Sequence, residues 1–429
     1  MSRLRTTAAA AALLLALPLS VAAAAPALAA PAAPVGASTS APVGASTSAP
    51  VGASTSAPVG ASTSTSASAS ASASASSPAA VHVDLPRPTG PYAVGQEILH
   101  LVDQDRPDPW VPSAGPRQLM VSMYYPAKAG TGSAAPYMTP EAARMLLDGK
   151  LPGNTIPTGA VTGTRTWAKS DARPQGGHFP LVVLSPGFTM PRASLSSLAE
   201  DLTSRGYVVA LVDHTYENTG TTFPDGQTLP CLLCDKLTTP ESWAAVDNSR
   251  AKDVSFVIDQ LTARPHPAWR YARMIDRDRI GMAGHSAGGA SAVPSLLTDD
   301  RIRAGVDLDG TMDVTVPASG IGGKPFLMIG HPLPDGAEDS SWTESWPHLD
   351  GWKRWLTFAG SNHGTFTDFP LFFEKLNLPE PPGTTMSGQR GIELTRSYVA
   401  AFFDMQLKDV QQPLLDGPAA ANPEVTFHP

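Results

Sequence analysis

The sequence predicts an α/β fold with a mostly parallel central sheet flanked by helices. After residue 80, short apolar runs rich in Val, Ile and Leu alternate with segments in which apolar residues have helical spacing. Such alternation is typical of strand–helix–strand units, in which the strands pair in parallel. About 350 residues remain in this part of the chain, which is enough for one large domain with a hydrophobic core.

Residues 1–29 have the pattern of a secretory signal peptide. Arg3 and Arg5 precede an Ala/Leu-rich run that ends at about Ala25, and an A-x-A sequence follows. A charged start, an apolar middle and small residues at the end are the parts of such a peptide, so we expect cleavage near Ala29. A retained membrane anchor is the alternative, which the small number of leucines and the cleavage site disfavour.

Residues 30–80 are a low-complexity segment. The sequence "APVGASTS" occurs four times from Ala33 to Ser64, and a Ser-Ala alternation then extends to about Ser77. We expect a disordered segment, because it has almost no large apolar side chain to bury, and a solenoid is excluded for the same reason. A flexible tether, a glycosylated stalk and repeat expansion without a function all fit this composition.

The remaining domain, residues 81–429, is acidic. The first 80 residues contain two arginines and no acidic residue, so the domain has 28 basic and 38 acidic residues. This balance argues against nucleic acid as a partner and against electrostatic docking on anionic lipid.

The strands and helices of the domain follow from runs of apolar residues and from their spacing. We expect strands at residues 119–125, 180–185, 207–214, 279–284, 302–309, 325–330 and 354–360. We expect helices at residues 192–206, with Gly206 as the stop, and at residues 245–263, 287–297 and 392–407. The stretch 215–243 has no clear periodicity, and loops of this length inside a domain are usually functional or mobile.

The chain has two cysteines, Cys231 and Cys234, in the sequence "LPCLLCDK". We expect them to form a short-loop disulfide, as is common in secreted proteins. A redox-active pair needs a helix N-terminus beside it, and Pro230 with the following leucines gives no sign of one. A zinc site is disfavoured because no second pair of ligands accompanies them.

Four glycines surround Ser286 in the sequence "GMAGHSAGGA". Residues 284–288 form a G-x-S-x-G motif between a predicted strand and a predicted helix. This turn forces the serine into a strained backbone conformation, and glycines two positions before and after it avoid collisions. Gly289 allows the helix to approach the sheet. We therefore expect Ser286 to be an exposed nucleophile at the carboxyl edge of the sheet.

A serine nucleophile needs a histidine base, which in turn needs an acid to orient it. Four histidines follow Ser286, at positions 331, 348, 363 and 428. We favour His363 because it comes directly after the last predicted strand, where this arrangement places its base. His331 also follows a strand, but one strand earlier.

The pattern alone leaves the acid open. Asp309 lies at the end of the strand 302–309, and Asp307 lies deeper in the same strand. Asp335 and Asp339 are in the loop after the next strand, and capping roles compete for all four residues.

Backbone N–H groups are expected to stabilise the oxyanion. One is that of Ala287, directly after the nucleophile, and the other comes from the loop "PGFTM", in which Phe188 is the best donor. Gly187 would allow close approach of the substrate.

Six short sequences together resemble the secreted (type II) platelet-activating-factor acetylhydrolase family of α/β hydrolases, which includes bacterial members of the lipase type. They are "PTGPYAVG", "MVSMYYPA", "VVLSPGF", "GHSAGG", "GVDLDGTM" and "GSNHGTFTDF". In that family the acid lies 23 residues after the serine in an L-D-[AG] context, which here is Asp309. The family's histidine lies in a G-S-x-H-x-x-F context, which here is His363. The mammalian members have H-G-L at the oxyanion loop, where this chain has Ser185-Pro186-Gly187-Phe188.

The resemblance implies a secreted hydrolase of carboxylic esters with short acyl groups, including the sn-2 acetyl group of phospholipids. It implies catalysis by Ser286, His363 and Asp309 without a cofactor or metal. An ester or phospholipid is the expected partner, with transient contact to a lipid interface and no obligate protein partner. A broader lipase or a cutinase-like polyester hydrolase is the alternative enzyme, with residues 365–373, "TFTDFPLFF", as an apolar wall near His363 or as an interfacial surface. A non-catalytic surface-binding protein is the alternative of another class.

Overall fold

The structure is a computed structural model that describes residues 82–429. The predicted signal peptide and the whole of the predicted tether lie outside the described residues, so these two assignments stay predictions. The described residues belong to one compact unit of the chain.

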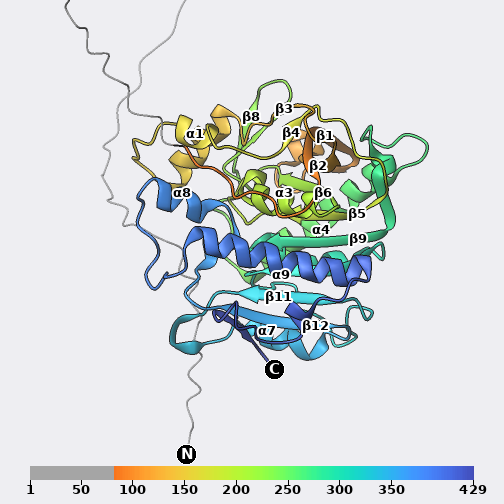
Figure 1. The fold of residues 1–429 in the computed structure, drawn as a ribbon. Coiled ribbons are helices and arrows are strands. Elements are labelled where there is room, and N and C mark those ends of the chain that lie inside the picture. The colour runs from red at the N-terminus through yellow and green to blue at the C-terminus, as the bar shows by residue number, and fades with distance from the viewer. Residues whose placement is uncertain (1–81) are drawn as a thin grey trace, which may run out of the picture. The chain divides into compact units, whose positions relative to one another are not determined.

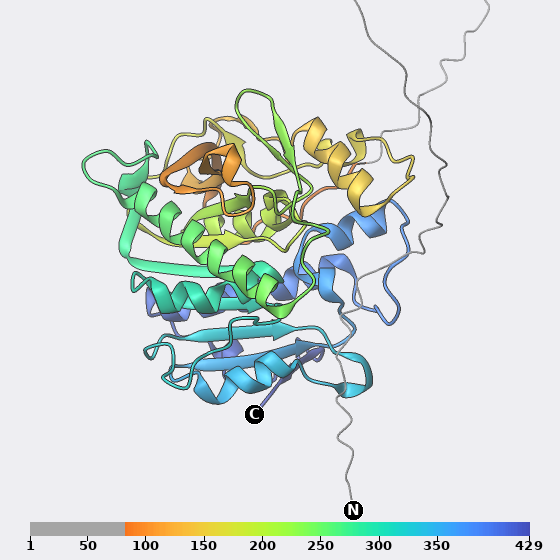
Figure 2. The same ribbon diagram turned by 180° about the vertical axis from the view of Figure 1, so that it is seen from behind.

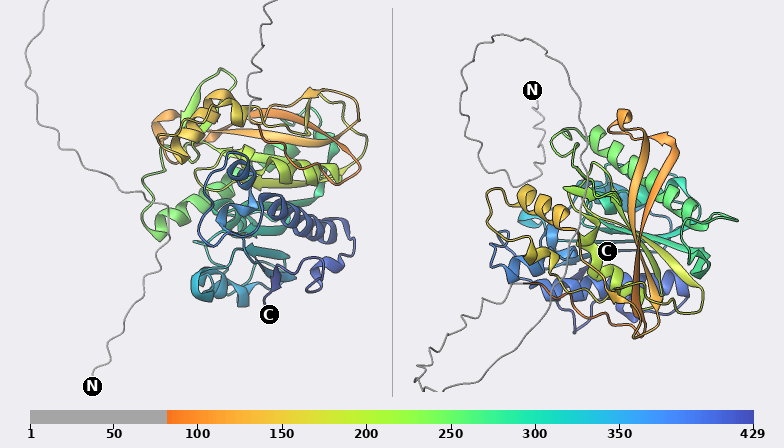
Figure 3. Two further views of the ribbon diagram at one scale, coloured as in Figure 1. Left: turned by 60° about the vertical axis from the view of Figure 1, so that its left-hand side comes forward. Right: turned by 90° about the horizontal axis from the view of Figure 1, so that it is seen from above.

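An 11-stranded mixed sheet forms the centre of the described part of the chain, in the order β13-β12-β11-β10-β9-β5-β6-β2-β1-β4-β3. The strands from β6 to β12 in this order pair in parallel, and antiparallel pairs flank them at β2 and β13. Strands β1 and β2 lie at the opposite end of the sheet from β13 (Figure 3). The strands of this sheet are β1 (Ala93–Pro107), β2 (Pro116–Ala127), β3 (Ser133–Ala134), β4 (Lys169–Ser170), β5 (Phe179–Ser185), β6 (Val208–His214), β9 (Ile275–His285), β10 (Ile302–Leu308), β11 (Phe326–Gly330), β12 (Lys353–Phe358) and β13 (Val425–Phe427).

Helices cover both faces of the sheet. Helices α3 and α9 pack on one face (Figure 1), and α4, α6 and α7 pack on the other (Figure 2). The helices are α1 (Pro140–Lys150), α2 (Gly159–Thr162), α3 (Ser196–Ser204), α4 (Pro240–Thr262), α5 (Ala287–Ala290), α6 (Ala292–Thr298), α7 (Ser340–Ser345), α8 (Phe369–Lys375) and α9 (Gly388–Lys408).

Strand β5 shows how the sequence builds two core layers. All seven of its residues are buried, as expected for a central strand of a parallel sheet. Leu181 and Val183 belong to the core on the α4 side, whereas Val182 and Leu184 belong to the core on the α3 and α9 side. Successive side chains of a strand point to opposite faces, so one apolar run supplies both layers.

The predicted strands and the α/β class are confirmed, but several details differ. The predicted helix from residue 192 begins as a 3-10 helix (Arg192–Leu195), with α3 following it, and α1, α8 and β13 were not predicted. The sequence did not predict β1, whose 15 residues include exposed polar positions. The predicted helix 287–297 is two short helices, α5 and α6, which meet at Ser291. Helix α4 begins at Pro240 rather than at residue 245, because Thr239 and Ser242 form a capping box at its start.

The long stretch 215–243 is partly ordered. It contains the hairpin β7 (Gly220–Thr222) and β8 (Thr228–Pro230), followed by a disulfide between Cys231 and Cys234. Among the described helices, none combines the length and the apolar character needed to cross a bilayer.

Candidate active site

Ser286 lies in a strained turn between β9 and α5. Its φ is +55° and its ψ is −128°, in a region that non-glycine residues rarely adopt. Its N–H donates to the carbonyl of Leu308 over 2.9 Å, which ties the turn to the end of the neighbouring strand β10. The strained turn therefore has the geometry that the G-x-S-x-G motif predicts.

The glycines of this turn make room for close backbone contacts. A Cβ atom on Gly284 would lie 2.2 Å from the carbonyl of Gly288, and one on Gly288 would lie 2.0 Å from the carbonyl oxygen of Ser185. A Cβ atom on Gly289 would lie 2.0 Å from a carboxyl oxygen of Asp307. Real Cβ atoms do not approach other atoms so closely, so the steric reason given for these glycines is confirmed.

Asp309 accepts hydrogen bonds from two histidines at the end of β10. Its Oδ2 lies 2.5 Å from Nδ1 of His363 and 2.7 Å from Nδ1 of His331, and its Oδ1 also accepts from the backbone N–H of His331. Burial would raise the pKa of Asp309, but the hydrogen bonds from His331 and His363 outweigh burial and hold this pKa below its usual value. The carboxylate therefore stays ionised and can fix the orientation of His363.

His363 is held beside the serine turn. It begins a short 3-10 helix (His363–Phe366) after β12, and its side chain is 51% exposed. The buried ring of His285, the residue before Ser286, donates from Nε2 to the carbonyl oxygen of His363 over 2.7 Å. The centroids of these two rings lie 4.7 Å apart. Burial lowers the pKa of His285 to about 3, so this ring is neutral and serves to hold the backbone of His363.

The hydrogen bond expected between Ser286 and His363 is not formed in the structure. Within residues 82–429 the hydroxyl of Ser286 donates no hydrogen bond to His363. Nδ1 of His363 faces Asp309, which leaves Nε2 as the nitrogen that can act on a hydroxyl. Such bonds often tighten only when substrate is bound, so the arrangement fits a base poised beside its nucleophile.

The structure also shows where the other histidines and aspartates considered for the catalytic roles lie. His331 was rejected because it follows an earlier strand, yet it is the second ring on Asp309. The order of the parallel strands was the signal for it, because β10 and β11 are neighbours and both end at the same edge. The remaining candidates are Asp307, buried beneath Gly289; Asp335, an exposed loop residue; Asp339, the N-cap of α7; His348, after α7; and His428, stacked on Trp355.

Two backbone N–H groups beside Ser286 have no acceptor. In the described part of the chain, neither the N–H of Phe188 nor that of Ala287 donates a hydrogen bond to another protein group. A Cβ atom on Gly187 would lie 2.9 Å from Nδ1 of His285, so the loop packs closely against the strand that leads to Ser286. Two free donors at this point are what an oxyanion hole requires.

A buried network of charges supports the loop that carries Phe188. Arg250 donates to the carbonyl oxygen of Pro186 over 2.5 Å and to Glu217 over 2.7 Å. The backbone of Glu217 accepts from the N–H of Thr189 over 2.8 Å. Contacts on both sides of Phe188 therefore fix this loop. No sequence signal pointed to the network, because its members come from distant segments.

Two groups of side chains in the described residues bring possible metal ligands within 4.8 Å of one another. They are Asp309 with His331 and His363, and His214 with Glu217 and Asp253. In the first group the Nδ1–H groups of both rings donate to the ionised carboxylate, so these nitrogens offer no lone pair. In the second group Arg117 and Arg250 already neutralise the carboxylates. Neither donor set fits a metal well.

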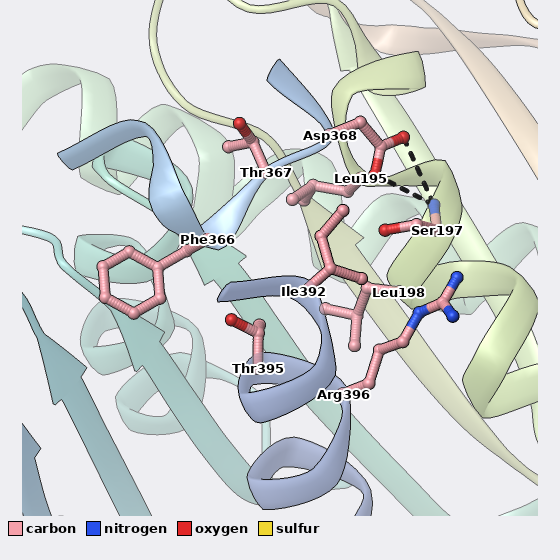
Figure 4. A pocket seen from close by; sticks show the side chains of 9 residues that line it. All are labelled: Leu195, Ser197, Leu198, Phe366, Thr367, Asp368, Ile392, Thr395 and Arg396. Carbon is pink, nitrogen blue, oxygen red and sulfur yellow. Dashed lines mark hydrogen bonds between the residues drawn. The ribbon is translucent and has the colours of Figure 1, made fainter. Parts of the chain in front are cut away.

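A small pocket behind the His363 loop contains Asp368 (Figure 4). Its volume is about 10 Å³, at the lower limit for one water molecule, so it is no substrate site. The carboxyl group of Asp368 accepts from the N–H of Ser197 in α3 and from the hydroxyl of Tyr137. Its own N–H donates to the carbonyl of Ser194 over 2.8 Å. Asp368 thus anchors the loop of the candidate base to the segment that follows the loop of Phe188.

Replacing Asp368 with asparagine is expected to flatten the pH dependence of stability between about pH 4 and 7. Burial raises the pKa of Asp368 to about 7, so in this window the folded state holds a proton that the unfolded state has lost. The free energy of unfolding of the wild type therefore falls as the pH rises, by at most about 4 kcal/mol from this group. Asparagine stays neutral, and urea unfolding at pH 5 and pH 7 measures the difference. Equal slopes in both proteins would contradict the prediction.

Comparisons with known proteins assign the chain to a family. The sequence model of the family "Platelet-activating factor acetylhydrolase, isoform II" matches residues 78–231 and 269–398. The chain belongs to this family. It has the α/β-hydrolase fold of the family and is a carboxylic ester hydrolase, as the named relatives below are.

Three relatives illustrate the range of the match. A solved structure, the ferulic acid esterase from Streptomyces cinnamoneus, is 42% identical with a TM-score of 0.72, covering 81% of this chain and 99% of that one. A protein of Arthroderma benhamiae named "Probable 1-alkyl-2-acetylglycerophosphocholine esterase" is 29% identical, covering 80% of this chain and 93% of its own. The bis(hydroxyethyl) terephthalate hydrolase of Streptomyces coelicolor is 29% identical over 31% of this chain and 33% of its own.

Proposed function

We propose that this chain cleaves esters through a covalent acyl-enzyme on Ser286. The Oγ atom of Ser286 attacks the ester carbonyl while His363 takes its proton. The bond from the carbonyl carbon to the alcohol oxygen then breaks, and His363 returns the proton to the leaving alcohol. Water, activated by the same ring, releases the acid and restores the serine. Asp309 holds His363 in the tautomer that this sequence of steps needs.

The observation that carries the proposal is the hydrogen bond of 2.5 Å between Asp309 and His363, beside the strained turn of Ser286. Two free donors support it, because the N–H groups of Phe188 and Ala287 can stabilise the oxyanion of the tetrahedral intermediate.

Short-acyl esters, among them phospholipids with an sn-2 acetyl group, are the first candidate substrates. The family description and the name of the Arthroderma benhamiae relative support this choice. Esters of aromatic acids are the second candidate. The names of the Streptomyces cinnamoneus and Streptomyces coelicolor relatives support it, and so do aromatic side chains that pack beside Ala287.

We further propose that residues 1–29 are a signal peptide, that residues 30–80 are a tether, and that the catalytic domain, residues 81–429, acts outside the cell. The disulfide between Cys231 and Cys234 fits an oxidising compartment. The acidic charge of the chain favours an ester over nucleic acid as its partner.

The alternatives are less well supported. A lipase or polyester hydrolase with residues 365–373 as an interfacial surface is disfavoured, because Phe366, Leu371 and Phe372 are buried. An inert surface-binding protein has no use for a strained serine beside a bonded Asp309–His363 pair.

Covalent labelling tests the proposed function. A fluorophosphonate probe is expected to phosphonylate the native protein once, with loss of fluoride, and peptide mass spectrometry is expected to place the label on Ser286. Heat-denatured protein is the control, since labelling requires the folded site. A native protein that stays unlabelled would support the inert binding protein instead.

A further inference from the structure

Five apolar side chains gather beside the two proposed oxyanion donors. Leu233 is buried, and Ala287 belongs to the same small cluster. Four partly exposed side chains pack around this cluster, which leaves apolar surface next to the reacting atoms. We call the following residues the aromatic wall: Trp110, Phe188, Leu233, Leu237 and Trp243.

The rings of the aromatic wall form a corner. The ring centroids of Phe188 and Trp243 lie 5.1 Å apart, with an angle of 75° between the planes. Such a corner offers the face of one ring and the edge of another, and a third flat ring packs well against both. Phe188 also supplies one backbone oxyanion donor, so a group that rests on its side chain lies close to the ester carbonyl.

Buried polar groups hold Trp110 in place. Its Nε1–H donates to Glu217 over 2.8 Å. Glu217 is fully buried and also binds Arg117 and Arg250. The orientation of this indole is therefore set before substrate arrives, which lowers the entropic cost of binding a ring against it.

The disulfide closes the loop that supplies Leu233. Cys231 and Cys234 are joined, and the N–H groups of Leu232 and Leu233 both donate to the carbonyl of Tyr216, over 3.0 and 3.2 Å. Leu233 is thus fixed from both sides, against Ala287.

Much of the aromatic wall lies where the family model does not match. The match stops at residue 231 and resumes at residue 269, and Leu233, Leu237 and Trp243 lie in between. Ser286, Asp309 and His363 all lie in matched parts. Three of the five wall residues therefore lie outside the part that the family model matches, whereas the catalytic residues lie inside it, which is the distribution expected of a selectivity element.

We propose that the aromatic wall receives the acyl group of the ester and favours a flat aromatic acyl group over acetyl. This inference rests on the proposed role of Ser286. An acetyl group reaches too little of the wall to gain from it, whereas a benzoyl ring can bury apolar surface against Trp243 and Phe188.

Two esters with the same leaving group test the inference. In p-nitrophenyl benzoate and p-nitrophenyl acetate only the acyl group differs, so the ratio of their kcat/KM values reports on the acyl side alone. Trp243→Ala is expected to lower kcat/KM for the benzoate about tenfold more than for the acetate. Trp167→Ala is the matched control, because Trp167 packs against Arg87 outside the wall, and we expect it to keep the wild-type ratio.

A second pair of variants protects the test against misfolding. Leu237→Ala changes a partly exposed member of the wall, and Cys231→Ser with Cys234→Ser opens the loop of Leu233. Both are expected to lower the benzoate to acetate ratio while circular dichroism stays native. Equal losses of kcat/KM on the two esters in all three variants would overturn the inference. It would also be overturned if the variants changed kcat/KM only among acetate esters that differ in their alcohol, because the wall would then bind the leaving alcohol instead of the acyl group. Failure of the proposed function is distinct, because Ser286→Ala would then hydrolyse both esters at the wild-type rate.

Discussion

Replacing Ser286 with alanine is expected to lower kcat for p-nitrophenyl acetate by about five to six orders of magnitude. The change removes the oxygen that forms the acyl-enzyme, so only attack by water on a bound ester remains. The oxyanion donors and the binding of the ester keep their effect, which leaves a residual rate above that of the reaction in water. Initial rates at saturating ester, followed by the release of p-nitrophenol, measure the loss.

The substitution is well matched to the turn. Serine and alanine both carry a Cβ atom, so the strain at φ +55° and the close contacts of Gly284 and Gly288 stay the same. Ser340→Ala, at the start of α7, is a control on the surface. A Ser286→Ala protein that keeps more than about one hundredth of the wild-type rate would contradict nucleophilic catalysis by this residue.

The serine turn was predictable because its signal is local. Ser286 and its glycines are neighbours in sequence, and the steric problem that they solve arises within one turn. Asp309 and His363 were predictable in a weaker sense, since their positions after strands place them at one edge of a parallel sheet, while the family spacing chose between candidate acids. The capping box of Thr239 and Ser242 was also local, but the apolar spacing farther along α4 hid it.

The buried polar contacts that hold the site in place were not predictable, because they join segments that lie far apart in the sequence. Arg250 holds the carbonyl of Pro186, 64 residues earlier, and Arg250 belongs to none of the quoted motifs. Trp110 reaches Glu217 across 107 residues. Apolar spacing detects burial along one element, but it does not tell which buried charge will meet which. The proposed acyl selectivity depends on these contacts, whereas the proposed chemistry follows from the motif.

Replacing Asp309 with asparagine is expected to lower kcat by about four orders of magnitude. The ionised carboxylate has two acceptor oxygens, which serve both rings and the N–H of His331. Asparagine has one acceptor oxygen and turns an N–H group toward one of the rings, so His363 loses either its orientation or its tautomer. The loss should appear in kcat for both acetate and benzoate esters, since the acyl side is untouched.

The variant His331→Gln tests the role of the second ring on Asp309 while it leaves the charge of Asp309 in place. Glutamine removes the ring that donates to Asp309 and leaves the backbone N–H of residue 331 in place. Asp309 then keeps His363 as a partner, and we expect a loss of about tenfold or less, the size of one hydrogen bond to a charged group. Burial lowers the pKa of His331, but its hydrogen bond to Asp309 outweighs this and raises the pKa above its usual value, so the ring binds Asp309 more strongly as the pH falls. Wild type and His331→Gln should therefore differ most at acid pH. A His331→Gln protein as inactive as Asp309→Asn would show that the second ring, rather than His363, carries the proton transfer.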